Sequence, residues 1–158
     1  YKRQIQHAGV VVGLGGVAAH VLCKLPRDAE GYMGRLRCVQ EISAVTAACM
    51  MVKTSVFKAV GGFDEELKVA FNDIDLCMKV RKYGVKIVFT PYAELYHYES
   101  KSRGMEDTPE KQLRFSREVN CFRRKWEREL LKGDPYYNPN LTLNNTDCSL
   151  RKQEKNGD

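Results

Sequence analysis

Gly61-Gly62-Phe63-Asp64-Glu65, followed by Phe71-Asn72-Asp73-Ile74-Asp75-Leu76, is the stretch from which the fold of this chain can be worked out. Two successive glycines can end a helix, because glycine adopts the left-handed conformation after a helix at little cost. Asn72 is a good N-cap, and the helix dipole favours the two carboxylates that follow it. Apolar residues then recur at helical spacing until Gly84: Leu76, Cys77, Val80 and Tyr83. The stretch predicts a glycine stop and then a helix that opens at Asn72.

Upstream of the glycines, apolar runs alternate with loops. Residues 5–12 form a short apolar run that leads into glycines, which predicts a strand entering a loop. Residues 26–37 are polar and contain glycine, as is typical of a long loop. Residues 42–52 are small and apolar, which predicts a buried strand, and Thr54 can cap a short helix before the two glycines.

Downstream, residues 85–89 and 92–98 predict two strands separated by Thr90-Pro91. Thr108 and Pro109 predict a helix start, with a capping hydroxyl followed by proline at the first helical position. An apolar stripe predicts one helix of about 24 residues, and it consists of Phe115, Val119, Phe122, Trp126 and Leu130. We expect an extended tail after Gly133 and disorder from residue 152.

Alternating strands and helices indicate the α/β class. The chain has 158 residues, 43% of them hydrophobic, which suits about one domain with a buried core. Yet about four strands and one long helix are few for a self-sufficient doubly wound sheet. The chain begins with Tyr1, so either its start was processed or it is a piece of something longer.

The cysteines and the hydropathy limit the environment of the chain. None of the six cysteines forms a CxxC pair, which argues against a zinc site. Cys49, Cys77 and Cys121 occur in apolar, periodic contexts, which predicts buried free thiols in a reducing compartment. No run of about 18 apolar residues occurs, so the sequence predicts no membrane-spanning helix.

The net charge of +6 raises the question of an anionic partner. Many of the cations lie in residues 114–132, which also contain Glu118, Glu127 and Glu129. A solvated helix face explains this mixture, and a basic nucleic-acid-binding module is the alternative. No recognised nucleic-acid motif accompanies the cations, so we expect no nucleic-acid partner.

A glycine motif near the start of the chain has the form of a dinucleotide-binding fingerprint. Gly13-Leu14-Gly15-Gly16-Val17-Ala18 matches GxGxxA directly after a predicted strand. That fingerprint also needs a packed helix, a second parallel strand and an acidic residue at its end. Pro26 interrupts the chain early and no strand follows before Arg37, so we reject this interpretation.

The motifs quoted at the outset, followed by a strand–proline–strand pattern that ends in Tyr96-His97-Tyr98, have a recognisable order. This order resembles the acceptor half of family 2 glycosyltransferases with the GT-A fold. The resemblance covers most of the chain, is strongest over residues 44–104, and continues into residues 134–141. It implies the C-terminal portion of a GT-A fold, with a mixed sheet, flanking helices and one long C-terminal helix. Residues 1–107 would form the acceptor-side half, and residues 108–151 the helix and tail that pack on it.

The resemblance also implies roles for individual residues. Asp73 corresponds to the catalytic base of an inverting sugar transfer, which removes the proton of the acceptor hydroxyl. The chain departs from the family at two positions, since Asn72 stands where the family commonly has glutamate and Tyr98 stands where it often has a second histidine. His97 would complete a metal shell or face the diphosphate. The implied substrate-binding residues are Thr46, Ala47, Ala48, Asp64, Asn72, Asp75 and Arg103.

The implied partners are a nucleotide-sugar donor, a glycan acceptor and a divalent cation, Mg²⁺ or Mn²⁺, in a bacterial enzyme of cell-surface polysaccharide synthesis. The nucleotide-binding half would lie outside this chain, so we expect the chain alone to be inactive. The resemblance is compatible with a cytoplasmic location, with peripheral association at the cytoplasmic membrane face, and with self-association of the fragment through exposed apolar strands. A non-catalytic carbohydrate-binding or scaffold domain is a further alternative.

Overall fold

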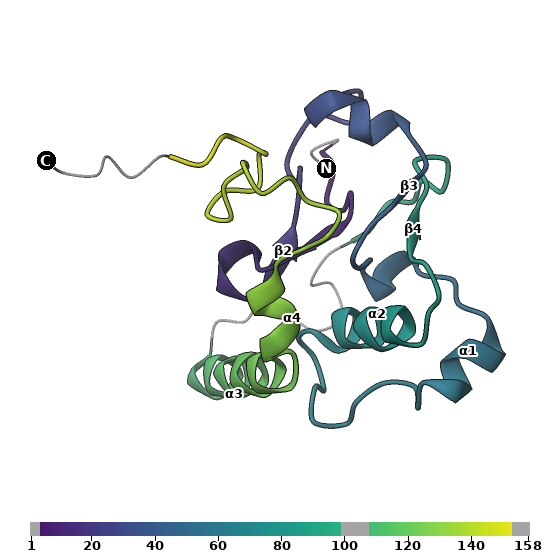
Figure 1. The fold of residues 1–158 in the computed structure, drawn as a ribbon, viewed down its shortest axis with the longest axis vertical. Helices are drawn as coiled ribbons and strands as arrows, with labels where there is room; N and C mark the ends of the chain where they lie inside the picture. Colours follow the sequence, from purple (N-terminus) through teal and green to yellow (C-terminus); the bar gives the residue numbers. More distant parts are fainter. Residues whose placement is uncertain (1–3, 99–107, 153–158) are drawn as a thin grey trace, which may run out of the picture.

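A computed structural model describes residues 4–98 and 108–152 of the chain. Helices α1, α2 and α3 lie along one side of the molecule, and the short strands with the 3₁₀ helix η2 lie on the other (Figure 1). Helices and strands are thus mixed, as the α/β prediction expects. The GT-A arrangement itself stays a prediction.

The first two strands form a hairpin, and the glycine motif makes the turn between them. Strand β1 (Val10–Val12) pairs with β2 (Ala18–His20) in an antiparallel register that places Val11 opposite Ala19. The turn between them contains η1 (Leu14–Gly16), and Gly13, Gly15 and Gly16 all have positive φ, which glycine adopts without a steric penalty. Because the chain returns antiparallel without a crossover helix, the rejection of a dinucleotide fold is confirmed.

A second pair of strands, β3 (Gln40–Glu41) and β4 (Val88–Phe89), is also antiparallel. One isolated bridge, between Val10 and Ala44, joins β1 to the segment that follows β3. The described part of the chain therefore contains two small antiparallel sheets instead of the predicted mixed sheet. The predicted strand over residues 85–89 is confirmed only at its last two residues.

Two predicted strands are wrong. The segment over residues 42–52 is buried only from Ile42 to Ala44, and it then turns into η3 (Ala47–Cys49), where Thr46 Oγ1 accepts a hydrogen bond from the Ala48 N–H. Such a side-chain bond to the backbone competes with a strand ladder. Residues 92–98 form no strand either, and their side chains are exposed.

The helices follow the prediction, but two of the predicted caps are wrong. Thr54 and Asn72 are the first residues inside their helices, and neither side chain caps its helix, because the cap positions before them are taken by other residues. Helix α1 (Thr54–Ala59) ends before the two glycines, and α2 spans Asn72–Lys82. Thr108 caps α3 (Pro109–Lys125) through the Lys111 N–H at 3.4 Å, as predicted. The long helix is broken at Trp126, where the backbone leaves the helical region, and continues as α4 (Glu127–Lys132).

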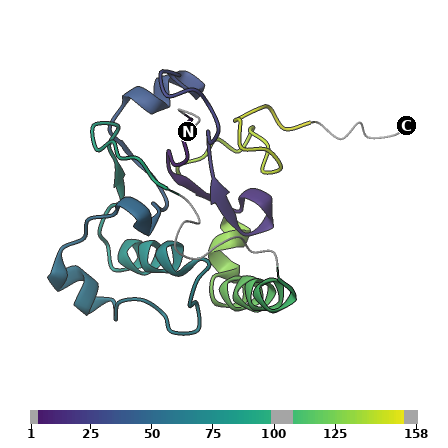
Figure 2. The same cartoon turned by 180° about the vertical axis from the view of Figure 1, so that it is seen from behind.

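The core joins the hairpin to the C-terminal helices. Val10 and Val12 pack with Leu67, Phe122 and Trp126 in one buried cluster. A second cluster lies between the hairpin and the tail after α4, which runs beside the N-terminal strands (Figure 2). The valines of β1 are therefore covered by the chain itself, which removes the reason for predicting self-association through them.

Three features bear on the environment. All six cysteines are free thiols, but Cys49 is exposed, which corrects its predicted burial, and Cys121 is only partly buried. No helix among the described residues combines the length and the apolar character needed to cross a bilayer. The predicted disorder from residue 152 falls almost wholly on residues outside the described ranges. Self-association stays a prediction that light scattering on the chain would test.

Candidate functional site

The site begins with a strained residue at the start of α2. Phe71 has a φ of 62°, in the left-handed region that residues with a side chain rarely adopt. Its ring is held by Phe115 and Phe122, with ring centroids at 5.8 and 5.3 Å. Strain of this kind costs roughly 1–3 kcal/mol and tends to occur at functional sites. It turns the chain so that Asn72 and Asp73 open the helix.

Asp73 is fixed by three hydrogen bonds. Its N–H donates to Asn72 Oδ1 at 2.7 Å, and its Oδ1 accepts from the Ile74 N–H at 2.9 Å. Its Oδ2 accepts from the Ala47 N–H at 3.0 Å, across the gap between α2 and η3. Each carboxylate oxygen has a second lone pair, so the partly exposed carboxylate can still accept a proton from outside.

The segment opposite Asp73 is held by side chains. Val45 donates its N–H to Cys77 Sγ at 3.5 Å, and the thiol lies within 3.7 Å of the Val45 carbonyl. Cys77 lies one helical turn after Asp73, so both face the same segment. Burial raises the pKa of the Cys77 thiol to about 11, which keeps it protonated as a hydrogen-bond donor. Thr46 and Ala47, predicted to bind substrate, thus adjoin the predicted base.

His7 holds the residue between Val45 and Ala47. The Thr46 N–H donates to His7 Nε2 at 3.4 Å, and His7 Nδ1 lies 3.0 Å from His20 Nδ1. The two rings meet edge to face, with centroids at 5.0 Å. His7 could not be predicted as a site residue, because a histidine in an apolar run belongs to no motif that would indicate a function.

The stability of the chain is expected to depend on pH through His7. Burial, with a smaller effect from His20, lowers the pKa of His7 from 6.5 to about 4. Between these values the unfolded chain binds the proton more readily, so the free energy of unfolding falls as the pH drops. From pH 7 to pH 4.5 this group should remove about 2 kcal/mol. Urea denaturation at both pH values should show a smaller loss in His7→Gln, and equal losses would contradict the shifted pKa.

Asp75 points away from Asp73, because residues two apart on a helix do not share a face. Its side chain is fully buried, and Oδ1 accepts from Trp126 Nε1 and from Lys125 Nζ, each at 2.8 Å. Lys79 Nζ lies 3.2 Å from Oδ2. With no exposed surface, Asp75 is not positioned to contact a substrate, contrary to the prediction from the resemblance.

Asp64 belongs to the same charged cluster. Lys125 bridges Asp64 and Asp75, and its hydrogen bond is the main reason why the pKa of the Asp64 carboxyl is lowered. Asp64 Oδ1 also accepts from the Glu66 N–H at 2.9 Å, which closes a local turn. These contacts connect the turn after the two glycines to α3, so the role that they indicate for Asp64 is structural.

His97 lies on the exposed segment after β4. Its Nδ1 is 2.6 Å from Gln6 Oε1, and Gln6 precedes His7. The contacts from His97 to Gln6, from His7 to Thr46 and from Ala47 to Asp73 therefore form one continuous series from His97 to Asp73. Arg103 lies outside the described residues. In the described ranges no three His, Cys, Asp or Glu side chains gather to hold a metal ion, so these residues alone do not fit the predicted cation.

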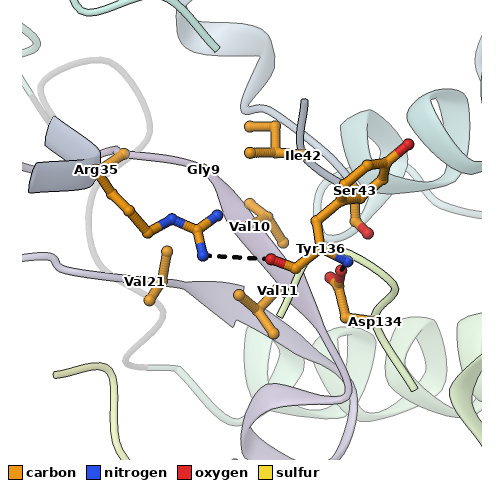
Figure 3. A pocket seen from close by; sticks show the side chains of 10 residues that line it. Gly9, Val10, Val11, Val21, Arg35, Ile42, Ser43, Asp134 and Tyr136 are labelled. Atoms are coloured by element: carbon orange, nitrogen blue, oxygen red, sulfur yellow. Dashed lines mark hydrogen bonds between the residues drawn. The ribbon is translucent and has the colours of Figure 1, made fainter. Parts of the chain in front are cut away.

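Two cavities among the described residues lie elsewhere. One of about 10 Å³ sits between the hairpin and the tail, where the Arg35 guanidinium donates to the Tyr136 carbonyl at 3.2 Å and the Tyr136 N–H donates to Asp134 at 2.9 Å (Figure 3). This volume is about that of one water probe. A groove of about 370 Å³ runs along α3 and is lined by Glu66, Lys68, Glu110, Leu113, Arg114, Arg117 and Glu118. Asp73 lines neither, so the candidate site lies outside both.

Comparison with known proteins places the chain beside segments of much larger ones. It is 57% identical over 148 residues to a Sinorhizobium fredii protein named uncharacterized protein y4gI, a match that covers 93% of the chain and 16% of the relative. It is 38% identical over 155 residues to the O-antigen biosynthesis protein RfbC of Myxococcus xanthus, covering 98% of the chain and 12% of the relative. A shorter match of 36% identity over 62 residues joins it to a Mycobacterium tuberculosis N-acetylglucosaminyl-diphospho-decaprenol L-rhamnosyltransferase, covering 39% of the chain and 20% of that enzyme.

No protein-family model matches the chain, and no solved structure matches it. The chain spans less than a quarter of the length of each of these curated relatives. Their names refer to O-antigen biosynthesis and to rhamnosyl transfer. By these matches the chain is related to segments of a polysaccharide-biosynthesis protein and of a glycosyltransferase.

Proposed function

We propose that this chain is the acceptor-side portion of an inverting glycosyltransferase, in which Asp73 is the general base. The observation that carries the proposal is the position of the Asp73 carboxylate. It opens α2, it is partly exposed, and one lone pair on each oxygen stays available beside the small residues Ala47 and Ala48. The relatedness to a rhamnosyltransferase supports the same class of reaction.

The proposed step is a single displacement at the anomeric carbon of a nucleoside-diphosphate sugar. The acceptor hydroxyl oxygen forms the new bond to that carbon while the bond to the diphosphate oxygen breaks. The hydroxyl proton passes to Asp73, and the nucleoside diphosphate leaves with the electron pair. The transition state resembles an oxocarbenium ion, as in glycoside hydrolysis. Thr46, Ala47 and Ala48 leave room for the sugar, because two of the three are alanines and both alanines are exposed.

The predicted divalent cation would balance the charge that develops on the leaving diphosphate. His97 is the described residue that we propose to face this group, either as one ligand or through the diphosphate itself. No step here depends on the metal, because the described residues do not form a site for it. Transfer measured with Mg²⁺, with Mn²⁺ and with a chelator tests this part separately. We also propose that the full-length enzyme is located at the cytoplasmic face of the membrane.

The experiment that tests the function uses the polypeptide that carries this chain together with a panel of uridine, guanosine and thymidine diphosphate sugars. We expect release of nucleoside diphosphate that depends on a glycan acceptor and produces a product with the inverted anomeric configuration. Nuclear magnetic resonance of the product determines that configuration. A product that retains the donor configuration would contradict the proposed single displacement.

A further inference from the structure

Successive backbone amides of residues 45–48 are held by side chains in place of a neighbouring strand. Val45 donates to Cys77, Thr46 to His7, Ala47 to Asp73 and Ala48 to the Thr46 hydroxyl, at distances from 3.0 to 3.5 Å. Three of the four acceptors come from β1, α2 or their flanks, far away in sequence. The geometry of Asp73 toward its surroundings therefore depends on what fixes this segment.

The bonding of His7 constrains where its proton lies. Because Nε2 accepts from the Thr46 N–H, that nitrogen carries no proton. A neutral imidazole then has its proton on Nδ1, which can donate to His20 Nδ1 at 3.0 Å. An imidazolium would have protons on both nitrogens and would face the Thr46 N–H with another donor. Only one protonation state of His7 is thus compatible with both contacts.

We propose that His7 and His20 form a neutral, hydrogen-bonded pair that positions residues 46–48 against the general base Asp73. His7 acts through Thr46 and Ala47, so it is a positioning residue and not a catalytic one. The role of the pair in turnover rests on the proposed function, whereas its effect on the backbone can be measured without any reaction.

The surroundings of His7 support this state. Its pKa lies well below neutrality, mainly because the ring is buried and further because His20 stands beside it. Among the described residues, the hydrogen-bond partners of the His7 ring are the Thr46 backbone amide and the His20 imidazole, and neither supplies a negative charge that would favour the charged form. His7 therefore stays an acceptor throughout the neutral pH range.

The first test is the tautomer itself. In the full 158-residue chain labelled with ¹⁵N, long-range proton–nitrogen correlations distinguish the two nitrogens of each histidine. We expect His7 at pH 7 to show the signature of a neutral ring protonated on Nδ1. A ring protonated on Nε2, or a charged ring, could not accept from Thr46 and would overturn the proposal.

The second test compares two substitutions. His7→Phe keeps a ring of similar size but can neither donate nor accept, whereas the amide of His7→Gln can still accept from Thr46. We expect the Thr46 amide to exchange its hydrogen about fivefold faster or more in His7→Phe, the scale of one lost hydrogen bond. His7→Gln should restore much of the protection. Unchanged exchange in a folded His7→Phe chain would show that His7 does not hold the segment.

The third test links the pair to turnover. In the polypeptide that carries this chain, His7→Phe should lower kcat by roughly ten to 100-fold with a smaller change in KM, since a base displaced by about 1 Å loses much of its effect. His7→Gln should recover most of kcat. Faster Thr46 exchange together with no transferase activity in the unaltered protein would refute the proposed function but not the positioning. Active transfer with an unaltered kcat in both variants would refute the catalytic part of the positioning role.

If His7→Phe fails to fold, His20→Phe provides an independent variant, because it removes the acceptor of the His7 Nδ1–H and leaves His7 in place. We expect the His7 ring to lose its single tautomer and the Thr46 amide to exchange faster. Retention of one tautomer with unchanged exchange would overturn the role of the pair.

Discussion

Replacement of Asp73 by asparagine is expected to lower turnover by on the order of 100-fold or more, the usual scale for the loss of a general base. Asparagine keeps the size of the side chain but cannot take the proton of the acceptor hydroxyl. Its NH₂ group would also face either the Ala47 or the Ile74 N–H, so one of the two hydrogen bonds would be lost. The measurement is kcat with saturating donor and acceptor in the polypeptide that carries this chain.

A matched control separates the chemistry from the loss of a negative charge. Glu127 is exposed at the start of α4, and Glu127→Gln removes one carboxylate without touching the candidate site. That variant should keep turnover within about twofold, because surface substitutions rarely disturb the fold. Turnover of Asp73→Asn close to that of the unaltered protein, with equal thermal unfolding, would remove Asp73 from the role of base.

The helices of this chain could be predicted because their signals are local. The glycine pair, the Asn72 start and the Thr108-Pro109 start each act within a few residues of the helix that they delimit. The break at Trp126 could not be predicted, because the apolar stripe continues through it. Its side chain donates to Asp75, a residue of another helix.

The strands were predicted less well, because a strand depends on a partner that may be distant in sequence. Residues 92–98 have the composition of a strand, yet no neighbouring strand pairs with them in the described part of the chain. Thr46 has the β-branched side chain typical of strands, but its hydroxyl caps η3 instead. A pattern of side chains indicates a preference for the strand conformation, but a strand forms only where another strand is available to pair with it.

In the candidate site, only residues that belong to a sequence motif could be predicted. Asp73 stands in a motif, and its contact with Ala47 joins two stretches that the resemblance had selected separately. His7 and Cys77 were not predicted as site residues, because each acts through hydrogen bonds to a backbone segment that only the folded chain brings near. Asp75 is an aspartate of the same motif as Asp73, and this shared residue type was misleading. Asp75 lies on the opposite side of α2, where it is buried.

The buried cluster around Asp75 leads to the largest expected effect on stability. Asp75 joins α2 to the break between α3 and α4, through Trp126 at 2.8 Å and Lys125 at 2.8 Å. Asp75→Ala would remove both contacts and leave Lys125 with Asp64 and Lys79 with the Gly62 carbonyl. Breaking a buried ion pair by removing one partner typically costs about 3–5 kcal/mol. We expect a loss of that size in the free energy of unfolding, measured by urea denaturation at pH 7.

Trp126→Phe is the matched control for this cluster. It keeps an aromatic ring in the core but removes the Nε1–H, while Asp75 keeps its contacts with Lys125 and Lys79. Since only one hydrogen bond to a charged group and part of a ring are lost, we expect a cost of about 1.5–3 kcal/mol, below that of Asp75→Ala. If the free energy of unfolding of Asp75→Ala lies within about 0.5 kcal/mol of that of the unaltered chain, the cluster does not stabilise the fold. Asp75 would then need another explanation for its burial, because an isolated buried carboxylate is itself destabilising.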